Sequence, residues 1–299
     1  MIASYLKALR APFLAGSIVP VLIGASDRFS TAHISFVAFL VTLGGVVFLH
    51  LGANLINDYY DARGSDPVNL KVTPFSGGSR VIQDKEVAPN AILILALWFF
   101  CLALACGIWL TFKGRLYVMV IGVAGLVAGW IYSGPPLQLM SKGWGEILIF
   151  LAFGPLITFG TYYALSGDLS MRAFLLGVPQ GFLITGVIWI NEFPDYEADK
   201  QVGKQNLVVR LGLEKSRYLY AIIMLLSFVC LLVYVITSYI SYLALVVFFS
   251  LPFALKAIHI AWHHYEEYEK IIPAQALTIQ TLIAQGLLLS SALALSKWF

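Results

Sequence analysis

The sequence predicts an all-α membrane protein with nine transmembrane helices in one domain, residues 1–299. Hydrophobic residues make up 60% of the chain and charged residues only 12%, whereas charged residues supply about a quarter of a soluble domain. Apolar runs of about 20 residues, the length that crosses a bilayer as a helix, recur along the whole chain. Because these runs do not alternate in polarity, and because backbone amides in lipid must be satisfied within the segment, a helical bundle is predicted and a β-barrel is not.

Nine segments account for the predicted helices, and every connection is short except the two that hold acidic residues. The segments are 11–26, 33–56, 91–112, 116–132, 146–165, 172–191, 217–237, 240–260 and 274–295. Pro20, Pro155 and Pro179 lie inside three of them and predict kinks, because proline cannot donate a helical hydrogen bond. The first segment looks like the apolar part of a signal peptide, but its nearly spanning length favours a retained helix.

The two sides of this nine-helix arrangement carry different numbers of basic residues. Fourteen Lys and Arg residues fall on the side of the N-terminus and five on the other side. Lys and Arg are enriched in cytoplasmic loops, so the N-terminus and the acidic clusters are predicted to be cytoplasmic and the C-terminus outside. The net charge of +3 is small and scattered, so neither a nucleic-acid partner nor a protein partner is implied.

Clusters of acidic and amide side chains follow the second and sixth segments. Carboxylates beside hydrocarbon are costly, and several that converge repel one another unless a cation neutralises them. Both clusters offer oxygen donors and lack His and Cys, which favours Mg²⁺ over Zn²⁺. The alternative, solvated acids at a helix C-terminus, is disfavoured because such acids oppose the helix dipole. The predicted metal ligands are Asn57, Asp58, Asp61, Asp66, Asn191, Asp195 and Asp199.

The spacing within each cluster is helical. If the second segment continues as a helix, Asn57, Asp58 and Asp61 share one face, and Asp66 follows a turn at Gly64. In the second cluster Asn191, Asp195 and Asp199 are four residues apart and form a similar stripe. Pro194 disfavours a helical conformation at Phe193, so a new short helix is expected to start there.

The two clusters also repeat one pattern. Asn, an acid, an aromatic residue, any residue and Asp occupy 57–61 and again 191–195, an offset of 134. This repetition predicts two related four-helix halves plus a ninth helix, with both clusters facing a central cavity. Two helix ends that face one cavity can hold a metal pair on a diphosphate.

Together these residues resemble the UbiA superfamily of intramembrane prenyltransferases along nearly the whole chain. The resemblance rests on both clusters, on Gly203-Lys204 and on the run 207–212. The runs 132–136 (Tyr-Ser-Gly-Pro-Pro) and 142–146 (Lys-Gly-Trp-Gly-Glu) look most like the branch that prenylates 1,4-dihydroxy-2-naphthoate for menaquinone. One departure is that four residues separate Asp61 from Asp66, where the superfamily often has three.

The resemblance implies a Mg²⁺-dependent transfer of a polyprenyl group from its diphosphate to a small aromatic acceptor, in a cavity that opens laterally to lipid. Asp61, Asp195 and Tyr132 are the expected catalytic residues, with the Tyr132 ring shielding an allylic cation. Diphosphate oxygens are expected to contact Arg10, Asn57, Lys142 and Lys200, although each cation could instead anchor the helix end at the interface. The backbone amides of 75–80 are further candidates, with a flexible lid turn as the alternative.

Alternative functions remain open at this stage. The acceptor could be 4-hydroxybenzoate or a glycerol phosphate that carries one prenyl chain, both used elsewhere in the superfamily. A cation-coupled transporter is the competitor from another class, because acids at repeated helix ends also form ion sites in carriers. Such sites lie near the membrane midplane, whereas both clusters here lie at helix ends on one side.

Overall fold

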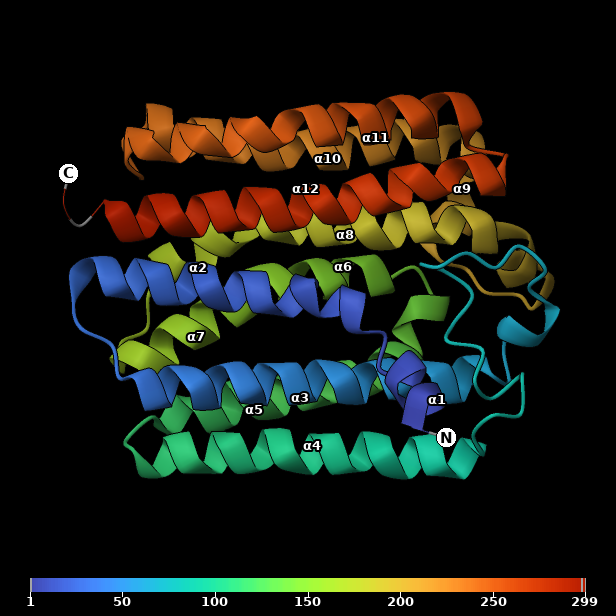
Figure 1. Ribbon diagram of the computed structural model, residues 1–299, viewed down its shortest axis with the longest axis horizontal. Coiled ribbons are helices and arrows are strands. Elements are labelled where there is room, and N and C mark those ends of the chain that lie inside the picture. The colour runs from blue at the N-terminus through green and yellow to red at the C-terminus, as the bar shows by residue number, and fades with distance from the viewer. Residues whose placement is uncertain (1, 297, 299) are drawn as a thin grey trace.

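The computed structural model describes residues 2–296 and 298, and it shows an all-helical bundle in which the long helices run along one common direction (Figure 1). Among the described residues, eight helical segments are long and apolar enough to cross a membrane, and a ninth is present if one bent pair counts as a single span. The predicted helical membrane bundle is therefore confirmed.

The bent pair is the first predicted segment. It consists of α1 (Ile2–Ala8), then a 3-10 turn η1 (Ala11–Leu14) and α2 (Ala15–Thr31), with a bend of 40° between the two parts. Arg10 lies at the break with φ +50° and ψ +48°, a left-handed conformation that ends α1 and redirects the chain.

The other spans follow the prediction closely. They are α3 (Phe36–Asp61), α4 (Pro89–Phe112), α5 (Leu116–Ser133), α6 with α7 (Gly145–Leu151 and Ile157–Ser166), α8 (Met171–Gln201), α10 (Leu213–Ile236), η5 with α11 (Tyr242–Ser250 and Leu251–His264) and α12 (Tyr268–Leu295). Short elements lie between them: η2 (Asp66–Val68), η3 (Leu139–Ser141) and α9 (Leu207–Leu211).

Prolines disturb the helices less than the sequence predicts. Pro179 and Pro194 both lie inside α8, which runs unbroken from Met171 to Gln201. The predicted new helix at Pro194 is therefore wrong, because the surrounding helices bury α8 and hold its conformation. Pro155 lies in a π-helical turn η4 (Ala152–Leu156) between α6 and α7, which is where the kink is predicted.

The π-helical turn η4 packs directly on α8. A side chain at Gly154 would clash with the backbone at Gly177 and Gly181, so glycine is needed for the two segments to approach this closely. Behind this contact α8 packs against α10 and α12, and it is the most buried span. In the other half of the bundle α3 packs on α4 and α5. Each cluster-bearing helix thus lies against the helix that follows it.

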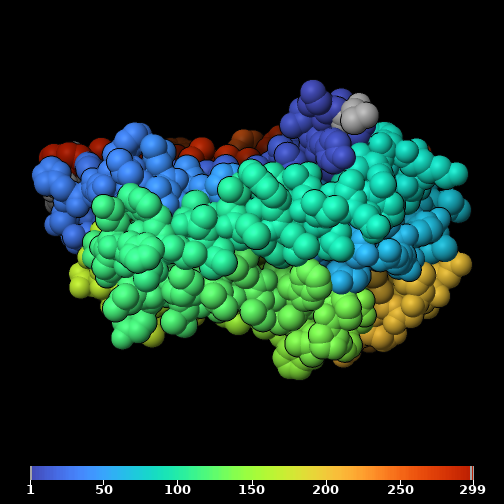
Figure 2. Space-filling view, turned by 90° about the horizontal axis from the view of Figure 1, so that it is seen from below, coloured from blue at the N-terminus to red at the C-terminus, as the bar shows by residue number. Residues whose placement is uncertain are grey.

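The outer surface of the bundle suits a lipid environment. Only 11% of the α4 window and 6% of the α5 window is buried, so both helices expose mostly apolar side chains. Figure 2 shows this face, which the green and teal residues of α4 and α5 cover, with α1 projecting at its edge. Exposed apolar side chains over whole spans are expected where lipid replaces water.

Candidate active site

One cavity of about 350 Å³ lies beneath the loops at the α1 end of the bundle. Its lining comes from Arg10 and η1, from α2 to α8 with the turns η3 and η4 between them, and from two loop segments, around 65–78 and 204–206. Within the described chain, α10, α11 and α12 add no side chain to the lining. All three lie outside the cavity: α10 and α12 pack against α8, α12 also packs against α2, and α11 packs against α10 and α12.

The first cluster lies on the last two turns of α3, which continues as a helix to Asp61. Asn57 and Asp61 line the cavity. The carboxamide nitrogen of Asn57 donates to Asp61 Oδ2 (2.9 Å) and to Ser133 Oγ (3.0 Å). Asp58 points elsewhere: it is buried outside the lining, and its Oδ1 accepts a hydrogen bond from the Ser79 amide (3.2 Å). The predicted shared face therefore holds for Asn57 and Asp61 but not for Asp58.

The second cluster lies on the last three turns of α8. Asn191, Asp195 and Asp199 all line the cavity, as their spacing predicts. Asp195 accepts hydrogen bonds from Asn69 Nδ2 (2.7 Å) and from the Gly77 amide (3.3 Å). The side-chain oxygen of Asn191, predicted as a metal ligand, instead accepts from Gln275 on α12 (3.0 Å).

Lys204 joins the two clusters. Its ammonium lies 3.0 Å from Asp61 Oδ1 and 3.2 Å from Asp199 Oδ1. Burial opposes the charge of this lysine, but the carboxylates of Asp61 and Asp199 outweigh it and raise the pKa of Lys204 above its usual range. Lys204 follows Gly203, whose φ of +79° lets the chain turn back from the end of α8 toward the cavity.

Asp66 completes the group of acids at this end of the cavity. It starts η2 and is buried, and its Oδ2 accepts a hydrogen bond from Gln83 (3.0 Å) while its backbone oxygen accepts from Arg80. Burial, together with the charges of Asp61 and Asp58, raises the pKa of Asp66 to about 7. A nearby cation would stabilise the ionised form of this carboxyl group.

The loop segment 75–80 binds the carboxylates. The amides of Gly77 and Ser79 donate to Asp195 and Asp58, and the Arg10 guanidinium donates to the Phe75 carbonyl (3.4 Å). The sequence suggested these amides as phosphate donors or as part of a flexible turn. In the structure they connect α3 and α8 across the mouth of the cavity.

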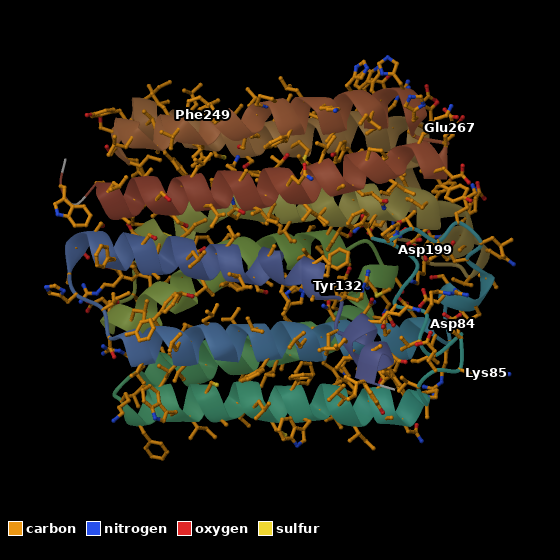
Figure 3. The ribbon with its side chains drawn as sticks, viewed as in Figure 1. Asp84, Lys85, Tyr132, Asp199, Phe249 and Glu267 are labelled. Carbon is orange, nitrogen blue, oxygen red and sulfur yellow. The ribbon has the colours of Figure 1, made fainter. Side chains whose placement is uncertain are left out.

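The four predicted cation and ring positions divide into two pairs. Arg10 and Tyr132 line the cavity. Arg10 Nη1 donates to Asn57 Oδ1 (3.5 Å) and lies 4.0 Å from Asp58. In the view of Figure 3, Tyr132, near the end of α5, lies farther from the loop end than Asp199. Lys142 and Lys200 are exposed and do not line the cavity, and Lys200 instead lies over the Tyr196 ring at 5.5 Å.

Several polar residues of the site were not predicted as site residues. Asn206 caps α9 through its Oδ1 and donates its Nδ2 to Asp199 Oδ2 (2.9 Å). Glu146 accepts from the Leu207 amide (2.6 Å), which holds α9 against α6. Glu192 lines the cavity next to Asn191. A signal existed for Lys204 and Asn206, because both follow the second cluster directly, but no periodicity places a loop residue in space.

The oxygen donors at the cavity mouth fit a Mg²⁺ ion whose remaining ligands come from substrate oxygens. Among residues 2–296 and 298, no three His, Cys, Asp or Glu side chains converge closely enough to form a full protein site. Asp61, Asp66 and Asp195 nevertheless offer carboxylates at the cavity mouth, and outside the lining the buried Asp58 Oδ2 has no hydrogen-bond partner in the described chain. Mg²⁺ typically takes one or two carboxylates plus phosphate oxygens.

Small residues line the deeper part of the cavity. They come from α3, α4 and α5 and include Gly45, Ala103, Gly107, Gly122 and Gly125. Side chains built at Gly107 and Gly122 would meet no neighbouring atom within 4 Å. The cavity thus has a polar, acidic mouth and a largely apolar interior, which is suited to a ligand with a charged head and a hydrocarbon tail.

Comparison with known proteins agrees with this geometry. The UbiA prenyltransferase family matches residues 16–283, so the chain belongs to this family and is an intramembrane prenyltransferase. The 1,4-dihydroxy-2-naphthoate octaprenyltransferase of Bacillus subtilis is 27% identical over 95% of this chain and 89% of its own.

Two solved structures share the fold. The apo structure of a UbiA homolog from Aeropyrum pernix K1 has a TM-score of 0.69 at 15% identity, covering 90% of this chain and 95% of that one. The structure of a UbiA homolog from Archaeoglobus fulgidus bound to DMAPP and Mg²⁺ has a TM-score of 0.63 at 17% identity, covering 96% and 99%.

Proposed function

We propose that this prenyltransferase moves a polyprenyl group from a polyprenyl diphosphate to an aromatic acceptor, with 1,4-dihydroxy-2-naphthoate as the preferred acceptor. The observation that carries the proposal is the pair of carboxylate-bearing helices, α3 and α8, at the mouth of an apolar cavity. A polyprenyl diphosphate has the same two parts, a strongly anionic head and a hydrocarbon chain.

The head group is assigned to the mouth of the cavity. Asp61, Asp66, Asp195 and Asp199 would hold Mg²⁺ there, with Asp58 supporting the site from behind. Bound Mg²⁺ supplies positive charge to the departing diphosphate, which is the electrostatic form of catalysis. Arg10 and Asn57 line the same mouth and can donate to diphosphate oxygens. Arg10 suits this role because a guanidinium presents a planar fork to phosphate oxygens.

The reacting centre is assigned to the region just beneath the head group. As the allylic C–O bond breaks, its electron pair leaves with the diphosphate and the allylic carbon becomes cationic. Tyr132 lines the cavity, and we assign it to this level, where the negative face of its ring can stabilise that cation. The acceptor ring carbon then forms the new C–C bond, and a ring proton leaves, so that its C–H electron pair restores the aromatic ring. Packed helices keep water away from the cation, which prevents simple hydrolysis.

The choice of acceptor rests on the relatives. The Bacillus subtilis relative is named for 1,4-dihydroxy-2-naphthoate. 4-Hydroxybenzoate and a prenylated glycerol phosphate are the alternative acceptors. A pocket fitted to a bicyclic ring buries more apolar area than a single ring can fill, so it should discriminate against 4-hydroxybenzoate.

Product formation in detergent tests both the class and the acceptor. Purified protein, Mg²⁺ and a polyprenyl diphosphate are incubated with the three acceptors at equal concentration, and products are identified by mass spectrometry. We expect prenylated naphthoate product, a kcat/KM that favours the bicyclic acceptor, and loss of turnover in excess EDTA that Mg²⁺ restores. Preference for either alternative would reassign the acceptor, and full activity in EDTA would remove the metal. Because detergent abolishes any gradient, a cation-coupled carrier would yield no product.

A further inference from the structure

A second group of polar side chains lies deeper in the cavity, and the proposed head-group chemistry does not use it. Ser17 on α2 and His50 and Asn54 on α3 all line the cavity, and Ser17 and His50 are buried. The wall around them is mainly apolar. A polar or ionisable side chain inside a membrane bundle is costly, and one that faces a cavity usually serves a substrate.

His50 extends the polar stripe of α3 inward. His50, Asn54, Asn57 and Asp61 lie at offsets of 0, 4, 7 and 11 residues, so they occupy one face of the helix. With a rise of about 1.5 Å per residue, His50 lies about 10 Å deeper than Asn57. The stripe therefore runs from the carboxylates at the mouth past the level where the allylic carbon would lie.

Neighbouring helices fix the imidazole ring. Ser17 Oγ lies 2.7 Å from His50 Nδ1. Phe153, in the π-helical turn η4, meets the ring edge to face at 4.8 Å between centroids and 74° between planes. Asn54 lies beside the ring one turn along α3. A side chain held by separate elements is pre-organised, as a substrate-contacting group should be.

We propose that His50 is the hydrogen-bond partner of a hydroxyl group on the aromatic acceptor, and that Ser17 is the positioning residue that fixes its ring. This assignment rests on the proposed function. The diphosphate is bound at the mouth, and the prenyl chain has no group that can form a hydrogen bond. The acceptor must lie beside the allylic carbon, deeper than the diphosphate, so its hydroxyl is the substrate group that can reach His50.

A purely structural link between α2 and α3 is the competing explanation, because buried hydroxyl and imidazole groups also join membrane helices. The two explanations differ in what a substitution changes. Loss of a link lowers stability and affects both substrates alike, whereas loss of an acceptor contact affects one substrate.

Steady-state kinetics of three variants separates them. His50→Phe keeps an aromatic ring beside Phe153 and removes the polar nitrogens, and Ser17→Ala removes the hydroxyl that orients the ring. Ser227→Ala is the matched control: Ser227 is also buried and bonds a side chain, Gln285 (2.9 Å), but it lies on α10 outside the cavity lining.

We expect His50→Phe to raise the KM for the acceptor about tenfold, the size expected for one lost hydrogen bond to a bound substrate. The KM for the polyprenyl diphosphate should stay within about twofold. Ser17→Ala should shift the same KM in the same direction by less, and Ser227→Ala should shift neither. Equal changes in both KM values, or a lowered Tm with unchanged kinetics, would assign His50 to structure instead.

An acceptor analogue tests the contact from the other side, even if the His50 variant does not fold. Each analogue lacks one hydroxyl group and competes with the acceptor for the wild-type enzyme. The analogue that lacks the hydroxyl bound by His50 should compete about tenfold less well than the others. His50→Phe should no longer distinguish that analogue from the acceptor. If every analogue competes as well as the acceptor in the wild type, the assignment is wrong while the proposed function stands. If the wild type prenylates no aromatic acceptor, both fall.

Discussion

At the scale of single residues, the site depends on how each carboxylate is neutralised. The Lys204 ammonium lies between Asp61 and Asp199, within 3.2 Å of both. The Asn69 side chain and the Gly77 amide donate hydrogen bonds to Asp195. These contacts hold α3, α8 and two loops together. Substrate and Mg²⁺ would therefore have to exchange with protein partners that are already in place.

This exchange predicts the behaviour of Lys204→Met. Removing one partner of a buried ion pair leaves an uncompensated charge, so the variant should lose about 3–5 kcal/mol of stability in the absence of metal. Mg²⁺ should then raise its Tm more than that of the wild type, because the vacated carboxylates bind the ion without displacing an ammonium. Thermal unfolding in detergent with EDTA or Mg²⁺ measures both shifts.

The control for this experiment is Lys215→Met, which removes an exposed lysine on α10. It should leave Tm unchanged with and without Mg²⁺. An equal effect of Mg²⁺ on the wild type and Lys204→Met would mean that Lys204 and the metal do not compete for the same carboxylates.

Sequence patterns predicted the helical part of the site and missed the part built from loops. The spacing of Asn191, Asp195 and Asp199 was sufficient to predict that they face the cavity together. α8 remains helical, and residues four apart on a helix point in nearly the same direction. Asp58 lies three residues before Asp61, a spacing that also predicts a shared helical face, yet its carboxylate turns to Ser79 because the group that binds it comes from a loop. Lys142 and Lys200 carry the right charge, but their exposure depends on tertiary packing that charge alone does not indicate.

At the scale of elements, the same distinction applies to the prolines. A proline at 194 predicts a break when the helix is considered alone, but α8 is enclosed by its neighbours and continues past it. Pro155 does coincide with an irregular turn, and there the backbone also has to accommodate a close approach to α8. Neighbouring helices therefore decide which proline changes the helix.

Gly154 provides the test at this scale. Gly154→Ala would place a methyl group within about 2.5 Å of backbone atoms at Gly177 and Gly181, so η4 and α8 must separate. Overpacking of this kind typically costs about 1–3 kcal/mol, and we expect a lower Tm in detergent. Gly122→Ala on α5 is the matched control, since its methyl group meets nothing within 4 Å and alanine favours helix. A Tm for Gly154→Ala at or above that of the control would show that the contact is not tight.

At the scale of the whole molecule, most charged residues lie at one end of the bundle. The end of the bundle that holds α1 carries the acidic clusters, on the last turns of α3 and α8, and most of the basic residues. The opposite end carries short turns such as that before α8 (Figure 1). Apolar run length predicted this arrangement well, because span length is set by bilayer thickness and not by packing detail. The cavity could not be located the same way, because its lining combines α2 to α8 with loops.

The orientation of this arrangement in the membrane is the last prediction. Fourteen of the 19 Lys and Arg residues lie on the side of α1, so that end should face the cytoplasm and the diphosphate should enter from there. Single cysteines at Lys85 and Asp168, both exposed, report the two ends once Cys101, Cys106 and Cys230 are replaced. On intact cells a membrane-impermeant thiol reagent should label the cysteine at 168 and spare the one at 85, and both should react after lysis. Labelling of 85 alone on intact cells would reverse the orientation and place the carboxylates outside, away from substrates made in the cytoplasm.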